Sequence, residues 1–600
     1  MLLRQPYRGP VRKLVLAFDV GTTYSSISYC ILQPGKVPKI EPVVRYPAQE
    51  HSGGYSKIPS ILYYDSNGTA RAIGAETLQE HIIDRAEDDG WITVEWFVLW
   101  KLRLRLRHLA ANYITDDDIP PLPPGKNAVE VLGDFMQYLF RCARSYIQET
   151  HPSGSALWRS LENRIEFVLT HPNGWEGPQQ KQIRLAAVLG GLVPGTEDGM
   201  TRVHLLTEGE ASLQYCVANT LASDALSKTP ILAPEDGEDD DISASQGVVV
   251  IDAGRVTVDL SAYSMSLSPT LIKEIAATEC RLQGSVFVTL RARDLLQEKL
   301  SGSRYGTPDI VQQMTEIFDR TTKRMFRNSE DPSYIKFGTI RDKDPQHDIR
   351  SGYLKLSGQV LQDVAKLFEP SISSIIEASE TQRKAAGTPI TFVFFVGRFA
   401  ANDWMFAKLH AYFQSLNISF SRPDNHCNQV VANGAVSYFI DHLVSTRVAR
   451  FTYGTECSVL FNPLDMEHRS RQKEVFRSVS GTLALPGAFS SILTKGTLVS
   501  VQQEFSKTFA IRRYNKAACN QVDVRIMLYR GLRQPDWMDT ERSLFSTSCT
   551  VHADTSKIAE KLTIKRSAEG STYYSMEIKV ILLFGLTELK AMISWEDGVS

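Results

Sequence analysis

Leu14–Tyr29 reads LVLAFDVGTTYSSISY, and Val248–Tyr263 reads VVVIDAGRVTVDLSAY. Each stretch is an apolar strand that ends at an Asp, followed by a turn containing Gly and a returning strand rich in Thr and Ser. Two such hairpins that face each other can hold a triphosphate, because backbone N–H groups at turns bind phosphate oxygens. The Asp at the end of each first strand, Asp19 or Asp252, can hold a magnesium ion through water. The two stretches therefore predict a nucleotide cleft between paired hairpins.

Length and composition are those of an ordinary globular protein with several domains. The chain has 600 residues, which is too long for one hydrophobic core, so about two to four domains are expected. Hydrophobic residues make up 43% and charged residues 22%. The net charge of −2 argues against a dedicated nucleic-acid binder. No apolar run approaches the roughly 18 residues that span a membrane, so we expect no membrane binding and a cytoplasmic location. Together with the net charge, which argues against nucleic acid, this leaves proteins and small molecules as the expected partners.

The pattern of the chain changes near residue 450. Before this point, strands alternate with helical segments, which is typical of an α/β fold. After it, short runs such as CSVLF, TLVSVQQEF and YSMEIKVILLF alternate with turns, which indicates a separate all-β domain. We expect residues 450–600 to form a β-sandwich-like domain without a helical lid.

Seven motifs occur in the order found in heat shock protein 70 chaperones, which belong to the actin-like ATPase superfamily. They read DVGTTYS from Asp19, HPNGWEGPQQKQIRLAAVLGGL from His171, TEGEAS from Thr207, DAGRVTVD from Asp252, FDRTTKRMF from Phe318, VGRFA from Val396 and NHCNQVVANGAV from Asn425. Tyr24 in the first motif is a residue that distinguishes these chaperones from actins. The resemblance covers residues 12–445 and is greatest to a divergent subgroup of fungi and animals whose substrate domain is altered.

This resemblance implies a two-lobed actin-like ATPase fold built from duplicated ribonuclease-H-like subdomains, followed by the all-β domain. Lobe I would span about residues 12–215, lobe II about 246–395, and closing helices 396–445. The resemblance also implies a chaperone-related protein that binds ATP or ADP with Mg²⁺, and unfolded or extended polypeptides and co-chaperones as partners.

The resemblance assigns two sets of site residues. The catalytic set contains Asp19, Glu208, Asp252, Asp259 and Lys101, with Asp19 and Asp252 also holding Mg²⁺ through water. Lys101 is the nearest candidate, by its order in the chain, for the catalytic Lys of the family. The nucleotide-binding set contains Gly21, Thr22, Thr23, Tyr24, Gly254, Arg255, Thr257, Gly284, Lys323, Arg324, Gly397 and Arg398.

The second phosphate motif departs from the family pattern, which has three consecutive glycines where this chain has Gly254, Arg255 and Val256. A Val in a left-handed turn costs about 1–2 kcal/mol, and its side chain occupies space near the phosphates. Arg255 has two interpretations that the sequence leaves open. It binds phosphate as a bidentate donor, or it points to solvent after function was lost.

The adenosine motif departs as well, because Arg398 replaces its second glycine. An Arg at this position either stacks on the base or blocks it. Lys323 and Arg324 either contact the adenine and ribose or form an exposed helix face. These changes, with the uncertain assignment of Lys101, predict slow hydrolysis at best, because phosphoryl transfer depends on positioned cations.

Three functional hypotheses follow. The first is a divergent heat shock protein 70-like protein that binds ATP with weak or absent hydrolysis. The second is a pseudo-ATPase that acts as a scaffold or peptide-binding module and holds no nucleotide. The third is a sugar or metabolite kinase on the same superfold, which the β domain after residue 450 and Tyr24 both disfavour.

Overall fold

The computed structural model describes residues 4–52, 57–95, 122–175, 177–220, 245–267, 270–423, 429–500, 503–567, 569–584 and 588–595. The chain divides into two compact units. The first contains Met1–Trp175, Gln179–Ile272 and Thr278–Leu443, and the second contains Val444–Ser600 with the short segments Glu176–Pro178 and Lys273–Ala277. The second unit thus begins a few residues before the boundary expected near residue 450.

A six-stranded sheet lies in the first unit, with the first hairpin at its centre. It contains β1 (Lys13–Val20), β2 (Tyr24–Leu32), β3 (Glu41–Pro42), β4 (Ile58–Pro59), β8 (Ile165–His171) and β9 (Val203–Thr207). The order is β3-β2-β1-β8-β9, and β4 pairs with β2. β1 and β2 are antiparallel, whereas β8 runs parallel to β1 and β9 parallel to β8. All of β1 after Lys13 is buried, as expected for an apolar strand inside a sheet that is covered on both faces.

A second sheet repeats this arrangement around the second hairpin. It contains β10 (Gln246–Ala253), β11 (Val258–Leu267), β12 (Thr270–Glu274), β13 (Glu279–Arg281), β17 (Ile390–Val396) and β18 (Ser419–Ser421). β10 and β11 are antiparallel, β17 runs parallel to β10, and β18 runs parallel to β17. In both sheets an antiparallel hairpin is therefore extended by two parallel strands on the side of its first strand.

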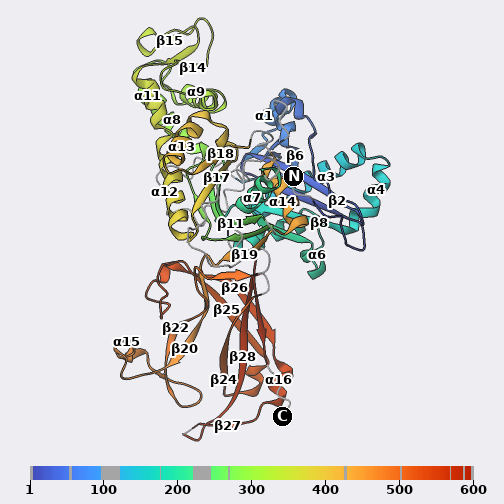
Figure 1. Cartoon of the computed structure of the whole chain (residues 1–600), viewed down its shortest axis with the longest axis vertical. Helices are drawn as coiled ribbons and strands as arrows, with labels where there is room; N and C mark the ends of the chain where they lie inside the picture. The colour runs from blue at the N-terminus through green and yellow to red at the C-terminus, as the bar shows by residue number, and fades with distance from the viewer. Residues whose placement is uncertain are drawn as a thin grey trace, which may run out of the picture. The chain divides into compact units, whose positions relative to one another are not determined.

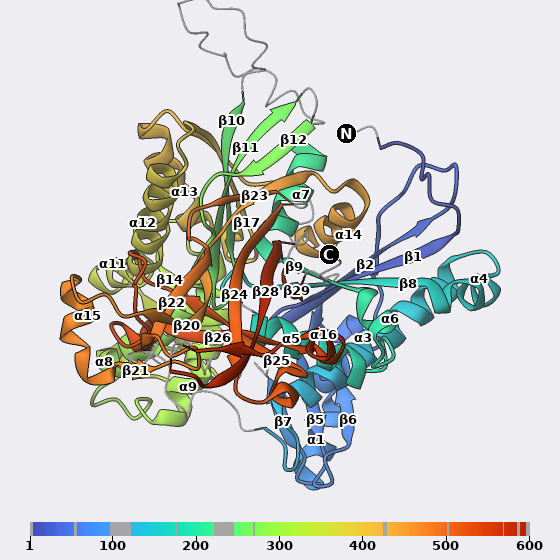
Figure 2. The ribbon, with the colours of Figure 1, turned by 90° about the horizontal axis from the view of Figure 1, so that it is seen from below.

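Two helices, α7 (Glu208–Thr220) and α14 (Val430–Asp441), lie between the sheets. α14 packs on β1, β2 and β8, α7 packs on β10 and β11, and the two helices pack on each other. A Cβ on Gly434 would lie 1.8 Å from the carbonyl oxygen of Ala211, so the helix backbones touch where they cross. Figure 2 shows this pair on one side of β17, with α12 (Glu369–Ala385) and α13 (Asp403–Ser415) on the other.

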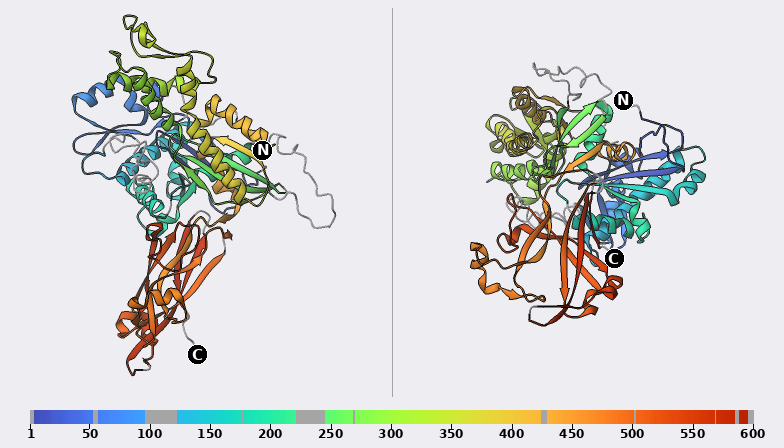
Figure 3. Two further views of the ribbon diagram at one scale, coloured as in Figure 1. Left: turned by 90° about the vertical axis from the view of Figure 1, so that its left-hand side faces the viewer. Right: turned by 60° about the horizontal axis from the view of Figure 1, so that its bottom comes forward.

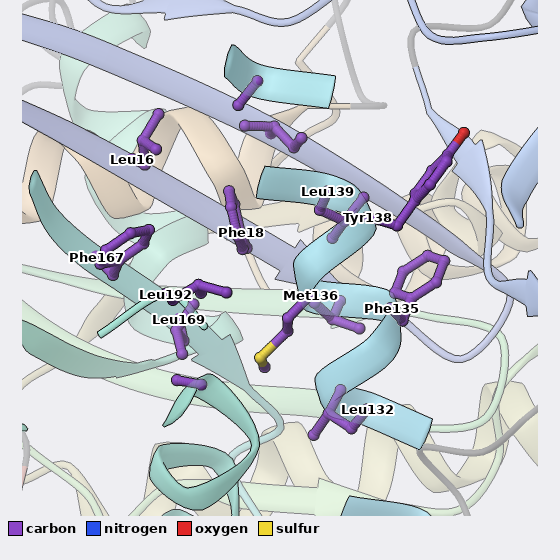
Figure 4. Close-up of a cluster of buried hydrophobic side chains, with 14 of the residues drawn as sticks. Leu16, Phe18, Leu132, Phe135, Met136, Tyr138, Leu139, Phe167, Leu169 and Leu192 are labelled. Carbon is purple, nitrogen blue, oxygen red and sulfur yellow. The ribbon is translucent and has the colours of Figure 1, made fainter. Parts of the chain in front are cut away.

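The main core of the first unit forms between α3 (Ala128–Thr150) and the first sheet. A capping box begins this helix, because the Asn127 side chain accepts from the N–H of Glu130 while the Glu130 side chain accepts from the N–H of Asn127. Figure 4 shows Leu132, Phe135, Met136 and Leu139 of α3 in one cluster with the side chains of the central strands, Leu16, Phe18, Phe167 and Leu169. This apolar face fixes β1, and with it the position of the first turn.

The other elements of the first unit are shorter sheets and the helices around them. The strands are β5 (Ile61–Tyr64), β6 (Ala70–Ile73), β7 (Ile92–Glu95), β14 (Ser333–Lys336), β15 (Ile349–Arg350) and β16 (Tyr353–Leu356). The helices are α1 (Glu80–Asp88), α4 (Gly154–Leu161), α5 (Gly177–Leu189), α6 (Glu197–Thr201), α8 (Ser285–Lys299), α9 (Pro308–Arg320), α10 (Thr322–Met325) and α11 (Gln359–Lys366). None of the helices in the described ranges combines the length and the apolar character needed to cross a membrane.

The second unit, orange to red in Figures 1 and 3, is made mainly of antiparallel strands. The strands are β19 (Val444–Val448), β20 (Thr452–Leu460), β21 (Phe476–Arg477), β22 (Leu483–Leu493), β23 (Leu498–Ser500), β24 (Glu504–Arg513), β25 (Gln521–Tyr529), β26 (Phe545–Asp554), β27 (Lys565–Arg566), β28 (Thr572–Phe584) and β29 (Leu589–Ser594). One sheet has the order β21-β22-β20-β25-β26, and the other pairs β28 with β24, β27 and β29. Both sheets contribute to one core, for example through Ile526 and Ile578. Two short helices, α15 (Met466–Ser470) and α16 (Ser556–Lys561), accompany them.

Candidate functional site

The first turn, residues 21–23, is held by Ser60, which follows β4. The Ser60 N–H donates to the carbonyl oxygen of Thr23 at 2.9 Å, and its hydroxyl donates to the carbonyl oxygen of Gly21 at 2.8 Å. A Cβ on Gly21 would lie 2.6 Å from the carbonyl oxygen of Tyr24, so this close approach of the backbone requires glycine. The turn that the first motif predicts is therefore built and supported by a neighbouring strand.

The second turn is closed on itself and anchored to α8. The N–H of Gly254 donates to the carbonyl oxygen of Thr257 at 2.9 Å. Three N–H groups at the start of α8 complete the anchor by donating to carbonyl oxygens of the turn. The N–H of Gly284 donates to Val256 at 2.9 Å, that of Ser285 to Gly254 at 3.2 Å, and that of Val286 to Arg255 at 2.8 Å. A Cβ on Gly284 would lie 2.4 Å from the carbonyl oxygen of Arg255. Gly284, predicted to bind nucleotide, thus lies directly behind the turn and supports it.

The strain expected at Val256 is absent from the second turn. Neither Arg255 nor Val256 has a positive φ, so the expectation of a left-handed Val is wrong. Val256 is only 4% exposed and belongs to the main hydrophobic core together with Val286 and Phe287. Its side chain points into the protein, because the anchored turn can direct an apolar group beneath itself.

Arg255 forms a partly buried ion-pair network with α9 and α10. Its Nη1 lies 3.0 Å from Oδ2 of Asp319. The other carboxylate oxygen of Asp319 accepts from Thr289 and from the ammonium group of Lys323. Because the Arg255 side chain is held in this way, the interpretation that it points to solvent is wrong. Its role as a phosphate donor stays a prediction.

Charge and burial oppose each other in this network. Burial raises the pKa of Asp319, but the charges of Lys323 and Arg255 outweigh it and hold that pKa well below its usual range. Burial also lowers the pKa of Lys323 to about 8, against the opposing charge of Asp319. Lys323 is 5% exposed, so the alternative in which it forms an exposed helix face is wrong, whereas Arg324 is exposed.

The predicted carboxylates gather where the two hairpins meet. Asp19 is 4% exposed, and its Oδ2 accepts from the Ser26 hydroxyl at 3.1 Å and from Lys57 Nζ at 3.0 Å. Asp252 is 6% exposed, and its Oδ2 accepts from the Ser212 hydroxyl at 2.7 Å. Each carboxylate thus has a hydrogen-bond donor, as buried polar groups require.

Neighbouring carboxylates raise the pKa values of Asp252 and Glu208. Burial, and then the charges of Asp259 and Asp19, raise the pKa of Asp252 to about 7, although the hydrogen bond from Ser212 opposes the shift. Burial, and then the charge of Asp259 and the other two carboxylates, raise the pKa of Glu208 well above its usual range. A cation that enters this cluster would favour the ionised forms.

Asn173 joins the second hairpin to the start of α7. Its N–H donates to Oδ1 of Asp259 at 2.9 Å, and its side-chain Nδ2 donates to the hydroxyl of Ser261 at 3.1 Å. Its Oδ1 accepts from the N–H of Gly209 at 3.4 Å, next to Glu208. Asn173 therefore positions Asp259 and Glu208 relative to each other.

Gly397 and Arg398 lie at the end of β17 beside the carboxylates. Gly397 has a φ of 90°, and a Cβ there would lie 2.4 Å from Oδ1 of Asp252. The guanidinium carbon of Arg398 lies 4.1 Å from the centre of the Tyr24 ring, which is a cation–π distance. Arg398 therefore joins the adenosine motif to the first phosphate motif across the cleft.

Two cavities lie between the motifs: the smaller, about 100 Å³, lies between the turns, and the larger, about 280 Å³, extends toward α10. A third cavity of about 1010 Å³ adjoins them and shares Thr22, Thr23, Tyr24, Arg255 and Arg324 with one or both. Of the predicted site residues, those that line the smaller cavity are Asp19, Gly21, Thr22, Thr23, Tyr24, Glu208, Asp252, Gly254, Arg255, Thr257, Gly397 and Arg398. Lys323 and Arg324 line the larger cavity, which shares Thr23, Tyr24, Lys57, Arg255 and Arg398 with the smaller one. Lys101 lies outside the described residues.

The side chains present do not fit a magnesium ion held directly by the protein. Within the described ranges, no group of three or more His, Cys, Asp or Glu side chains is placed to hold a metal ion. At Asp19, the position of a cation is taken by the ammonium group of Lys57. The predicted contact of Asp19 and Asp252 with Mg²⁺ through water stays a prediction.

Sequence reasoning missed three residues of this site: Lys57, Asn173 and Asp319. A signal was available for Asp319, because it precedes Lys323 by one helical turn within the motif FDRTTKRMF. Asn173 lies in the motif from His171, in a turn after a buried strand. Lys57 directly precedes β4, but no local pattern shows that this strand pairs beside Tyr24.

Comparison with known proteins shows a distant similarity to a heat shock protein. Human heat shock 70 kDa protein 12B is 24% identical to the chain over 206 residues. This match covers 34% of the chain and 28% of that protein, so the chain spans less than a third of the relative's length. No family model matches the chain. The similarity and the mixed α/β architecture are compatible with a relation to heat shock protein 70 and the two-lobed actin-like ATPases.

Proposed function

We propose that the first unit binds ATP or ADP between its two hairpins and hydrolyses ATP slowly or not at all. The observation that carries the proposal is the meeting of both turns at one cavity. Thr22 and Thr23 come from the first hairpin, Gly254 and Thr257 from the second, and Asp252 lies between them. Turns of this kind offer N–H groups and hydroxyls to phosphate oxygens.

The charges around the larger cavity also favour an anionic ligand. Its charged lining residues are five cations and one carboxylate, namely Lys57, Arg255, Lys323, Arg324, Arg398 and Asp319. Arg and Lys are the side chains that bind phosphate most effectively. A nucleotide whose phosphates enter the small cavity and whose base and sugar occupy the larger one would neutralise this excess of positive charge.

Slow hydrolysis follows from the state of the carboxylates. The pKa of Asp252 is about 7, so a fraction of this carboxyl group is protonated at neutral pH in the free protein, and burial with neighbouring carboxylates also raises the pKa of Glu208. A protonated carboxyl group is a poor base for the attacking water.

A second candidate is a scaffold that binds no nucleotide. The cavity between the turns is small, at about 100 Å³, so a nucleotide would have to extend into the adjoining cavities of about 280 and 1010 Å³. The contact of Arg398 with Tyr24 also lies where a nucleotide would pass. Nucleotide binding therefore requires that Arg398 move.

We further propose unfolded or extended polypeptides and co-chaperones as partners in a chaperone-related role. In the described part of the second unit, β24 pairs along one side only, with β28. An extended peptide can add to such an edge through main-chain hydrogen bonds. Lys507, Arg512 and Arg513 on β24 would favour acidic segments.

Calorimetric titration of the full chain with ATP and ADP in the presence of magnesium tests the proposal. We expect saturable binding to one site and little turnover. Thr23→Val, which removes a hydroxyl from the cavity lining, should weaken binding, whereas Thr381→Val on the exposed part of α12 should not. Absence of binding by the unaltered chain would reject the proposal in favour of the scaffold.

A further inference from the structure

The ammonium group of Lys57 lies inside the carboxylate cluster of the cleft. Lys57 Nζ is 3.0 Å from Oδ2 of Asp19, and the Lys57 side chain is 19% exposed. The residue directly precedes β4, which pairs with β2 at Tyr24 and Ser25. Its backbone is therefore fixed beside the first turn, and its side chain reaches the end of β1.

Lys57 differs from the other cations around the small cavity in what it faces. Arg255 is paired with Asp319, and Arg398 stacks on Tyr24. Lys57 instead faces Asp19, and its positive charge also acts on Asp252 and Glu208, where it opposes the rise of their pKa values. It lines both the small and the large cavity, so it also lies where phosphates would enter.

We propose that Lys57 is the resident cation of this cleft, so that the site binds the phosphates of ADP or ATP without a divalent metal. The inference rests on the proposed nucleotide function and specifies how that site balances charge. In the free protein, Lys57 neutralises Asp19, because a buried carboxylate without a partner is costly. When nucleotide binds, the same ammonium group contacts phosphate oxygens as a compact charge with three donors.

This proposal explains two observations together. The described carboxylates form no direct metal site, and an ammonium group lies at the carboxylate that ends the first strand. A protein that relied on a metal ion here would have to move Lys57 away from Asp19 for the ion to approach. A protein that relies on Lys57 needs no such rearrangement.

The test is calorimetric titration of the full chain with ADP and with ATP, in buffer with excess EDTA and in buffer with magnesium. We expect the affinity of the unaltered chain to be the same in both buffers within experimental error.

Lys57→Met keeps the length of the side chain and removes its charge. It should weaken binding in EDTA by about tenfold or more, the scale of a lost hydrogen bond to a charged group. Magnesium should then restore part of the affinity, because the carboxylates have lost their cation. Lys366→Met, at an exposed position on α11, is the matched control and should bind as the unaltered chain does.

The outcomes separate this inference from the function on which it rests. Binding that requires magnesium in the unaltered chain overturns the resident cation and leaves nucleotide binding intact. Equal affinity of Lys57→Met and the unaltered chain in EDTA also overturns it and reduces Lys57 to a structural partner of Asp19. Absence of binding in both buffers rejects nucleotide binding itself. If Lys57→Met does not fold, Lys57→Arg should still bind nucleotide in EDTA. The comparison of the unaltered chain in EDTA and in magnesium then tests the resident cation by itself.

Discussion

At the scale of single residues, Asp252 makes the stability of the free protein depend on pH. Its pKa is about 7 in the folded chain against an ordinary value of 3.8, because burial and neighbouring carboxylates disfavour its charge. The folded state thus keeps a proton that the unfolded state releases, and rising pH between the two values lowers the free energy of unfolding. The loss is at most about 4 kcal/mol for three pKa units.

Denaturant unfolding at several pH values between 4 and 8 measures this dependence. Asp252→Asn keeps an acceptor for the Ser212 hydroxyl and removes the titrating group, so its unfolding free energy should fall less as the pH rises. The exposed substitution Asp84→Asn is the control and should keep the slope of the unaltered chain. An identical slope for Asp252→Asn would show that Asp252 ionises normally.

The buried side chain of Val256 contributes to the stability of the first unit. The family pattern has glycine at this position, but Val256 is buried in the core and has no positive φ. Val256→Gly should therefore destabilise the chain by about 2–4 kcal/mol, from lost apolar burial and added backbone entropy. Chemical denaturation measures this change in the free energy of unfolding, and Val37→Gly at an exposed position is the comparison. If Val256→Gly were more stable than the unaltered chain, the turn would be strained at Val256 and the prediction would be wrong.

At the scale of elements, the crossing of α7 and α14 governs the contact between the two sheets. In an exposed helix, Gly→Ala stabilises by about 0.5–1 kcal/mol. At Gly434 the added methyl group would meet the carbonyl oxygen of Ala211, so Gly434→Ala should instead destabilise the first unit by about 1–3 kcal/mol. Urea unfolding measures the sign of this change in stability. A gain in stability would mean that α7 and α14 do not touch at Gly434.

The elements around the two hairpins were readable from sequence because their signals are local. The apolar run before Asp19, the Gly at position 21 and the returning Ser-rich strand all lie within one short stretch. The partners of these residues were not readable. Lys57 and Asp19 meet only after β4 pairs with β2, and Arg255 and Asp319 meet only after α9 folds beside the second turn. Long-range contacts of single side chains leave no periodic pattern in the sequence.

At the scale of the whole molecule, the second unit should fold without the first. Its core comes from its own two sheets, with residues such as Ile526, Leu528, Ile578 and Val580 fully or almost fully buried. A fragment of residues 444–600 should give a β-type circular dichroism spectrum and a single cooperative thermal transition. A mainly helical spectrum, or gradual melting, would contradict this. The spectrum should not change when nucleotide is added, because the proposed site lies in the first unit.

The anchoring of the second turn to the start of α8 bears on how a turn of this kind can change in sequence. Main-chain carbonyl groups hold the turn, and every amino acid supplies one. Exchange of glycines for Arg and Val at positions 255 and 256 therefore leaves the path of the chain intact. At position 255 a mutation acts mainly on the charges of the cleft, whereas at position 256 it also changes a buried side chain of the core and so affects folding stability. A turn that is held by its main chain can thus change its side chains, and with them its chemistry, while the surrounding architecture stays the same.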